Sequence, residues 1–366
     1  AVPTLHLGDA DANVEATLTL ARAADAAGIA LAVYPELGLV GYSNQDLFHQ
    51  QVLVESAEAA LLALAARTAA LETALVVGLP LRVGSQLFNV AAVLHRGRVL
   101  GVVPKSYLPN YREFYEKRHF AAARQASVDH VRIGAVDVPF GTDLVFEADD
   151  LDGFVVAVEI CEDLWVPAPP STWTTLAGAT VVANPSASNV TVAKADYRRQ
   201  LCSSQAARTL SAYVYAAAGA GESTTDLAWD GHAIISENGN VVADGERFGT
   251  GPELVTADVD LDRLIADRLR TTSFGDSAAD LLAGRTFRRI PFHVGRPTEA
   301  VELRRHVGRH PFVPSDPERR DARCAEVFDI QVNGLATRLA ATGIDTVVIG
   351  VSGGLDSTQA LLVAAR

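Results

Sequence analysis

Three reactive side chains follow three apolar segments that have the character of buried strands. The pairs of segment and side chain are 29–34 with Glu36, 98–103 with Lys105, and 153–160 with Cys161. In layered α/β folds, ligands bind beyond the carboxyl ends of the strands. If these three strands share one sheet and one direction, we expect the three side chains to converge on one rim.

A carboxylate, an ammonium and a thiol are a complete set for cleaving an amide through an acyl-enzyme. The thiol of Cys161 must lose its proton to attack a carbonyl, and the carboxylate of Glu36 can take that proton. The ammonium of Lys105 can stabilise the oxyanion of the tetrahedral intermediate. Taken singly, each residue also has an ordinary structural explanation: a helix-capping glutamate, a surface lysine and a small buried cysteine. The common position after a strand favours the catalytic interpretation.

Other chemistries have weaker support in the sequence. None of the nine histidines lies in a segment typical of a Cys–His nucleophile pair, and His232 begins a predicted strand, where a structural role is expected. The two histidines of the segment HVGRH at 306–310 have a spacing found in metal sites, but the segment lacks further ligands. We predict no metal site in this part of the chain, and we expect Cys202 and Cys324 to pack on helices.

Five sequence blocks resemble the nitrilase (carbon–nitrogen hydrolase) superfamily over about residues 1–270. They are YPELGLVGYS, PKSYLPNYREFYE, EICEDLW, NPSAS with the following YRRQLCSSQAAR, and AYVYAAAG. The resemblance implies a four-layer αββα sandwich with Glu36 as the base, Lys105 as the oxyanion support and Cys161 as the nucleophile. The resemblance also implies that this site needs no cofactor.

The same resemblance suggests further site residues. Glu113, eight residues after Lys105, matches a second glutamate that orients the lysine or the substrate. Similarity to the glutamine-using members implies substrate contacts from Tyr111, Phe114, Ser188 and Lys194.

A second motif lies near residue 350, where a predicted strand over 346–351 leads into SGGLDS and then a helix. Adjacent glycines and a helix N-terminus suit a phosphate group. The string resembles the PP-loop of ATP pyrophosphatases, with Mg²⁺ near the aspartate. The ATP-binding residues implied are Gly350, Val351, Ser352, Gly353, Gly354, Leu355, Asp356 and Ser357. Only about 40 residues of such a domain are present, so its sheet cannot be complete here.

An amidase joined to a PP-loop domain is the combination found in the family of glutamine-dependent NAD⁺ synthetases. The resemblance implies glutamine, ATP and nicotinic acid adenine dinucleotide as substrates, with Mg²⁺, an ammonia channel and a homo-oligomer, either an octamer or another dimer-based assembly. Two other hypotheses stay open: a free-standing amidase with an unrelated C-terminal extension, and a non-enzymatic scaffold that keeps the fold.

Composition and pattern set the broad limits. The chain has 366 residues, 49% hydrophobic and 20% charged, with a net charge of −13. These values predict a large core and disfavour nucleic-acid or anionic-membrane binding. Three scattered cysteines and the absence of a signal peptide or an apolar membrane span favour the cytoplasm. The chain contains no methionine and stops within a predicted helix, so we expect missing sequence at both ends.

The predicted organisation is α/β with three parts. Residues 1–275 form the nitrilase-like glutaminase domain, 276–321 a linker rich in Arg, Pro and Gly, and 322–366 the first part of a Rossmann-like ATP-binding domain. Within the first part, the pattern predicts helices over 13–28, 55–73, 171–179 and 193–212. Asn13 is the expected N-cap of the first of these.

Overall fold

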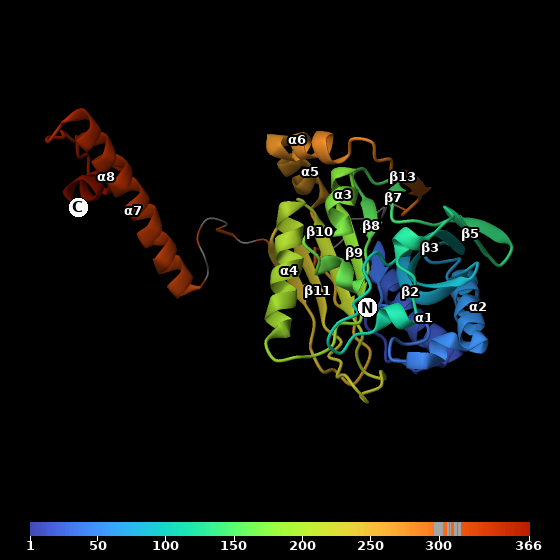
Figure 1. Ribbon diagram of the computed structural model, residues 1–366. Coiled ribbons are helices and arrows are strands. Elements are labelled where there is room, and N and C mark those ends of the chain that lie inside the picture. The colour runs from blue at the N-terminus through green and yellow to red at the C-terminus, as the bar shows by residue number, and fades with distance from the viewer. Residues whose placement is uncertain (296–302, 306, 308, 311–312, 314–315) are drawn as a thin grey trace. The chain divides into compact units, whose positions relative to one another are not determined.

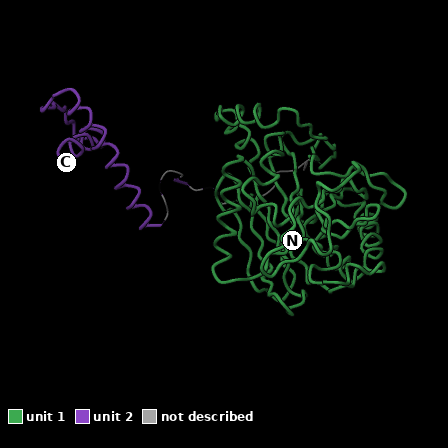
Figure 2. The backbone as a smooth tube through the Cα atoms, viewed as in Figure 1, with its two compact units in different colours: residues 1–305 green, residues 306–366 purple. Residues whose placement is uncertain are grey.

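The computed structural model describes residues 1–295, 303–305, 307, 309–310, 313 and 316–366. The chain divides into two compact units, residues 1–305 and 306–366, which Figure 2 shows in green and purple.

The first sheet of the larger unit has four strands in the order β1-β2-β3-β4. Their bounds are β1 Leu31–Val33, β2 Ala74–Val83, β3 Gln86–His95 and β4 Arg98–Pro104. β1 pairs parallel with β2, and the other pairs are antiparallel, so β1 and β4 run in the same direction. Helices α1 (Ala10–Ala26) and α2 (Gln51–Arg67) pack against each other, and α2 also packs on β2 and β4.

The second sheet has seven strands in the order β12-β11-β10-β9-β8-β7-β13. Its bounds are β7 Leu144–Ala148, β8 Val155–Val158, β9 Val181–Ser186, β10 Ala212–Ala217, β11 Ala233–Glu237, β12 Asn240–Asp244 and β13 Arg288–Phe292. The central strands β8, β9 and β10 are parallel and almost wholly buried, which explains their continuous apolar sequences. Helices α3 (Pro170–Leu176) and α4 (Lys194–Arg208) pack on this sheet.

The layers stack as helices, sheet, sheet and helices, with α1 and α2 on one side and α3 and α4 on the other (Figure 1). Separate apolar clusters fill the spaces between successive layers. Leu18, Leu61 and Leu79 belong to the cluster under α1 and α2, and Val76 and Val158 belong to the one between the sheets. The predicted four-layer αββα architecture is therefore confirmed.

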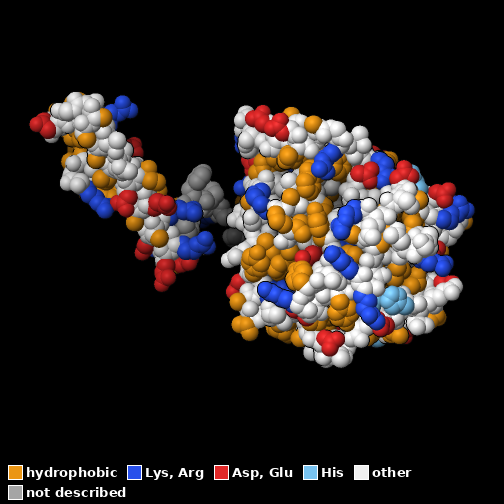
Figure 3. All heavy atoms as spheres, in the orientation of Figure 1, with side chains coloured by type: hydrophobic (Ala, Val, Ile, Leu, Met, Phe, Trp, Pro, Cys, Tyr) orange, Lys and Arg blue, Asp and Glu red, His pale blue; other side chains and the backbone are white. Residues whose placement is uncertain are grey.

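The remaining strands and α-helices of the larger unit lie at its margins. They are the hairpin of β5 (His130–Ile133) and β6 (Val136–Pro139), and the helices α5 (Leu261–Arg270) and α6 (Thr272–Leu281). On the face seen in Figure 3, lysine and arginine side chains are scattered between hydrophobic patches.

Helix boundaries differ from the sequence predictions. α1 begins at Ala10, and its N-cap is Asp9, whose side chain accepts a hydrogen bond from the N–H of Ala12. Asn13 lies inside the helix instead, where its amide donates to the carbonyls of His6 and Leu39. The predicted cap was wrong because both residues are good capping types and the apolar pattern fits either start.

The predicted linker also begins too early. α6 extends past residue 275, and β13 pairs parallel with β7 as an edge strand of the large sheet. Within β13, Arg288 forms an ion pair with Asp143, so the Arg- and Pro-rich composition conceals a strand. The compact larger unit ends at residue 305 rather than 275.

The smaller unit contains helices α7 (Pro317–Thr342) and α8 (Leu355–Ala365), which pack against each other. The predicted strand over 346–351 is wrong, because these residues have no regular structure. Val348 is 96% exposed. No helix in the described parts of the chain is long and apolar enough to span a membrane.

Candidate active site

Glu36, Lys105 and Cys161 converge on one site, although not from one sheet. β1 and β4 of the first sheet lead into Glu36 and Lys105, and β8 of the second sheet leads towards Cys161. The two sheets meet at this point, where the N–H of Glu36 donates to the carbonyl of Ser186 at the end of β9. The predicted convergence is present, but it occurs across the interface between the sheets.

The carboxylate of Glu36 is fully buried and held through one of its oxygens. Oε1 accepts hydrogen bonds from Nζ of Lys105 at 2.5 Å and from Nδ2 of Asn89 at 2.7 Å. Among the described residues, Oε2 has no hydrogen-bond partner. The free oxygen can accept a proton, as a general base requires.

The ammonium of Lys105 lies between two carboxylates. Besides Glu36, Nζ donates to Oε1 of Glu116 at 2.7 Å, and both Lys105 and Glu116 are buried. Burial opposes the charge of Lys105, but the two carboxylates outweigh it and hold the pKa of Lys105 well above its usual value. Burial raises the pKa of Glu116 to about 7, against the lowering effect of Lys105 and with a further increase from Glu36.

Of the two roles predicted for Glu113, orienting the lysine belongs to Glu116 instead, and orienting the substrate stays a prediction, since Glu113 lines the pocket in front of Cys161. Glu113 accepts a hydrogen bond from Nδ2 of Asn189 at 2.8 Å, whereas Glu116 contacts Lys105. Both residues lie in a segment without long regular elements, so spacing along the chain could not show which side chain turns inwards.

Cys161 occupies a strained backbone position at the start of a short 3₁₀ helix, Cys161–Leu164. Its φ is +46°, a left-handed conformation that is uncommon for residues other than glycine. Its N–H donates to Oδ1 of Asn184 at 3.0 Å. This sharp turn projects the side chain out of the line of the strand.

The thiol of Cys161 is protonated at rest. Burial raises its pKa, and the carboxylates of Glu36 and Glu116 add to this effect, while Lys105 and the backbone of Ala187 oppose it. Because these charged groups all act on the sulfur, the four side chains share one electrostatic site. Attack by the thiol therefore requires proton removal during the reaction. Glu36 and Glu116 each have one carboxylate oxygen without a partner among the described residues, and of the two Glu36 acts more strongly on the sulfur.

Asp163 joins the lysine segment to the cysteine turn. Its carboxylate accepts hydrogen bonds from the N–H groups of Tyr107 at 2.8 Å, Ile160 at 3.0 Å and Ser106 at 3.3 Å. Two of these donors directly follow Lys105, and the third directly precedes Cys161. Asp163 thus fixes the distance between the two functional residues.

A pocket opens in front of Cys161 and contains every substrate-contact residue that the sequence predicted. Its lining includes Cys161, Glu162, Trp165 and the predicted residues Tyr111, Glu113, Phe114, Ser188 and Lys194. The hydroxyl of Tyr111 donates to Oε1 of Glu162 at 2.7 Å. Oγ of Ser188 has no partner among the described residues. The pocket therefore combines aromatic walls with groups of both charges.

Lys194 is a partly buried cation of this pocket, which Arg112 also lines. Its Nζ donates to Oδ1 of Asn189 and lies 5.7 Å from the ring centre of Phe114 and 5.2 Å from that of Trp165. Burial lowers the pKa of Lys194, partly offset by Cys161 and Glu113. The cation is thus held over two aromatic faces, where it can meet an anionic group of a ligand.

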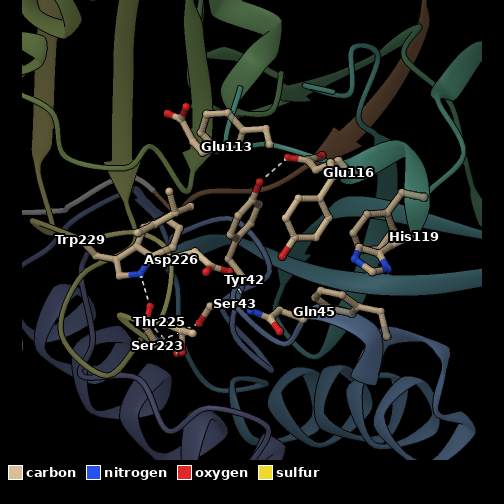
Figure 4. Close-up of a pocket in the computed structure, with 15 residues that line it drawn as sticks. Tyr42, Ser43, Gln45, Glu113, Glu116, His119, Ser223, Thr225, Asp226 and Trp229 are labelled. Atoms are coloured by element: carbon tan, nitrogen blue, oxygen red, sulfur yellow. Dashed lines mark hydrogen bonds between the residues drawn. The ribbon is translucent and has the colours of Figure 1, made fainter. Parts of the chain in front are cut away.

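Behind the same segment lies a second pocket, which Figure 4 shows. Glu113 and Phe114 line both pockets, so they form the wall between them. In the second pocket the hydroxyl of Tyr42 donates to Oε1 of Glu116 at 2.8 Å (Figure 4). The second pocket therefore reaches the charged groups of the site from the opposite side.

A buried arginine supports the loop that carries Ser188. Nη1 of Arg198 donates to both carboxylate oxygens of Asp230 at 2.8 Å, and Nη2 donates to the carbonyls of Asn189 at 2.9 Å and Ser188 at 3.4 Å. Arg198 is fully buried. The YRRQ string of the sequence gave no sign of this role, because helical periodicity does not distinguish a fully buried arginine from the half-buried one beside it.

The predicted ATP-binding residues lie in the smaller unit, at the start of α8. Gly354 is the N-cap of α8, Gly353 has φ of +84°, and Oγ of Ser357 accepts from the N–H of Ser352 at 3.2 Å. Residues 350–356 are almost all exposed. The local loop geometry suits a phosphate, and ATP binding stays a prediction.

The segment HVGRH at 306–310, whose histidine spacing was weighed as a metal site, begins with His306, which lies outside the described residues.

The family of the chain follows from its sequence as well as its fold. Residues 3–269 match the model of the carbon–nitrogen hydrolase family. The chain belongs to this family, and the buried Glu–Lys–Cys arrangement agrees with that membership.

More specific similarity is to glutamine-dependent NAD⁺ synthetases. The chain is 53% identical to the one from Mycobacterium tuberculosis over 359 residues, covering 98% of this chain and 53% of that protein. It thus spans about half the length of the curated relatives it matches. Solved structures of the enzymes from Cytophaga hutchinsonii and, in complex with ADP, Acinetobacter baumannii match with TM-scores of 0.61 and 0.59, both at 27% identity. They cover 70% and 72% of this chain, and the matches span 41% and 45% of theirs.

Proposed function

We propose that residues 1–305 form a glutaminase that supplies ammonia to a glutamine-dependent NAD⁺ synthetase. The observation that carries the proposal is the pocket in front of Cys161, whose lining contains Lys194 together with Glu113 and Glu162. An amino acid zwitterion needs a cation for its carboxylate and an anion for its ammonium group. Glutamine satisfies both while directing its side-chain amide towards the thiol.

The charges of the site suit each step of amide hydrolysis. As the sulfur of Cys161 forms a bond to the amide carbon, Glu36 takes the thiol proton on Oε2, and Lys105 stabilises the oxyanion. Glu36 then returns the proton to the departing nitrogen, the C–N bond breaks and ammonia leaves. Glu36 next removes a proton from water, whose oxygen attacks the thioester. The C–S bond breaks, glutamate leaves, and Glu36 passes the proton to the sulfur, which restores the thiol of Cys161 and the carboxylate of Glu36.

The synthetase activity is proposed for the whole protein. The similarity to NAD⁺ synthetases supports the ammonia amidating an adenylylated nicotinic acid adenine dinucleotide, with ATP as the activating substrate. The loop 352–357 would contribute its glycine N–H groups and serines to the phosphates, and Asp356 would lie near Mg²⁺. A channel for ammonia and a homo-oligomeric assembly belong to the same proposal.

The test compares Cys161→Ala with Cys202→Ala, a change at a buried cysteine of α4 that lies outside the pocket. In the complete protein, Cys161→Ala should lower glutamine hydrolysis by at least about 10⁴-fold and leave synthesis from free ammonia unchanged. Cys202→Ala should retain both activities. Loss of ammonia-dependent synthesis in Cys161→Ala would contradict two separable sites.

The amidase alternative predicts a different response. A free-standing amidase would release ammonia at the same rate with or without ATP and nicotinic acid adenine dinucleotide, whereas a coupled glutaminase should respond to both. A non-enzymatic scaffold would leave Cys161 unmodified by 6-diazo-5-oxo-norleucine. We expect a covalent adduct on Cys161 by mass spectrometry.

A further inference from the structure

Two histidines and an aspartate meet at the surface beside the second pocket. Each of Asp46, His49 and His119 offers one atom that could bind a metal, and these atoms all lie within 4.8 Å of one another. The glutaminase chemistry proposed above uses none of them. We propose that these three residues form a binding site for a divalent metal ion such as Zn²⁺.

The local backbone brings the first two ligands to one face. Asp46 and His49 belong to the 3₁₀ helix Gln45–His49. Side chains three residues apart in a 3₁₀ helix eclipse one another, so the carboxylate and the imidazole project in the same direction. The third ligand, His119, comes from a segment 70 residues further along the chain.

The two imidazoles already have a spacing that suits a metal. Nδ1 of His119 lies 3.2 Å from Nε2 of His49. Zinc bonds to histidine nitrogen are about 2.0–2.1 Å long, so two ligands of a tetrahedral site are about 3.4 Å apart. A small side-chain rotation would place a cation between the two nitrogens and leave a fourth position open.

His119 is half-buried, and its surroundings hold the ring in position. Nε2 of His119 has no partner among the described residues, so the ring can keep its proton on Nε2. A cation can then replace the hydrogen bond that joins Nδ1 of His119 to Nε2 of His49. The ring itself is held by Phe48 and Phe120, at centroid distances of 5.7 and 6.1 Å.

The carboxylate of Asp46 is shared with an arginine. Arg118 donates to its two oxygens at 2.7 and 2.8 Å. Each carboxylate oxygen keeps a second lone pair for a metal. The arginine therefore competes with the cation for Asp46, which predicts that removing its charge will tighten metal binding.

A bound cation would join two segments next to the catalytic groups. His119 follows Glu116 by three residues and lines the second pocket together with Glu116 and Gln45 (Figure 4). The site would therefore tie the 3₁₀ helix Gln45–His49 to the segment that orients Lys105. It involves none of the residues assigned to the reaction, so its test is independent of the proposed function.

The experiment measures Zn²⁺ binding by the 366-residue chain in competition with a chromogenic chelator. The background is Cys161→Ala with Cys324→Ser, because Cys161 and the exposed Cys324 could bind zinc through sulfur. One equivalent of Zn²⁺ should bind, and His49→Gln and His119→Gln should each weaken it by about 10-fold or more. Far-UV circular dichroism and the thermal midpoint without metal check folding; His49 is exposed, so its variant tests the site even if His119→Gln is unstable.

The matched control is His293→Gln, at the second cluster of a histidine with carboxylates, Asp149, Asp150 and His293. This control should bind Zn²⁺ as tightly as the background. Absence of binding in the background, equal affinity in His49→Gln, or loss of affinity in His293→Gln alone would each overturn the proposal.

The role of the carboxylate is tested by opposite changes in affinity. Asp46→Asn should weaken Zn²⁺ binding, and Arg118→Gln should tighten it, each by several-fold. Unchanged affinity in both variants would remove the carboxylate from the site and overturn a three-ligand arrangement.

Discussion

Oε1 of Glu116 lies 2.7 Å from Nζ of Lys105, deep in the site and three residues past the glutamate that the sequence favoured. Glu116 should therefore act on the catalytic step, and Glu113, which lines the pocket, on substrate binding. For glutamine hydrolysis, we expect Glu116→Gln to lower kcat by about 10²-fold or more with little change in KM.

The matched variant Glu113→Gln should change mainly KM and not kcat. We expect its KM for glutamine to rise by about 10-fold, with a smaller change in kcat. Steady-state kinetics of both variants distinguish the roles. A fall in kcat for Glu113→Gln that equals or exceeds the fall for Glu116→Gln would assign the orientation of Lys105 to Glu113.

The pKa of Glu116 also predicts how activity depends on pH. Burial raises that pKa to about 7, so Glu116 loses its proton as the pH rises through neutrality. Its negative charge then offsets Lys105 and makes Glu36 a stronger base. The profile of kcat/KM for glutamine should therefore rise with an apparent pKa near 7, and this limb should disappear in Glu116→Gln. An unchanged limb in that variant would assign it to another group.

The sequence predicted the reactive triad because each member follows an apolar strand, and a strand exit is recognisable without knowledge of the sheets. It could not predict that Cys161 reaches the site from a different sheet, since sheet membership depends on long-range pairing. Glu116 was missed for a related reason. The segment after Lys105 has no periodicity that fixes the direction of a side chain.

The errors elsewhere have their own physical causes. Arginine and proline are unusual in strands, yet Arg288 in β13 lies at a sheet edge, where it can pair with Asp143. Residues 346–351 are apolar enough for a strand, but a strand needs a neighbour for its backbone hydrogen bonds. The described residues of the smaller unit provide none.

Gly78 allows close contact between β2 and the segment that carries Glu36. A Cβ at this position would lie 2.3 Å from the backbone nitrogen of Leu37 and 2.9 Å from the carbonyl carbon of Glu36. Gly78→Ala should therefore displace Glu36, destabilise the fold by about 1–3 kcal/mol and reduce kcat. Urea unfolding and glutaminase kinetics measure both effects.

Gly251→Ala is the control, because nothing lies within 4 Å of the Cβ it would add. We expect wild-type stability and activity for this variant. If Gly78→Ala matched it in both measurements, the backbone contact would not be what positions Glu36.

Arg198 supports the substrate pocket through its planar group, which bonds to Asp230 and to the carbonyls of Ser188 and Asn189 at the same time. Lysine keeps the charge but cannot reproduce this fork. Arg198→Lys should therefore loosen the loop and raise KM for glutamine by about 10-fold, with a loss of about 1–3 kcal/mol in unfolding free energy from buried groups left unpaired. The neighbouring Arg199, whose side chain is 32% exposed, provides the control Arg199→Lys, and its KM should not change. Equal KM values for the two variants would show that the buried fork does not position the pocket.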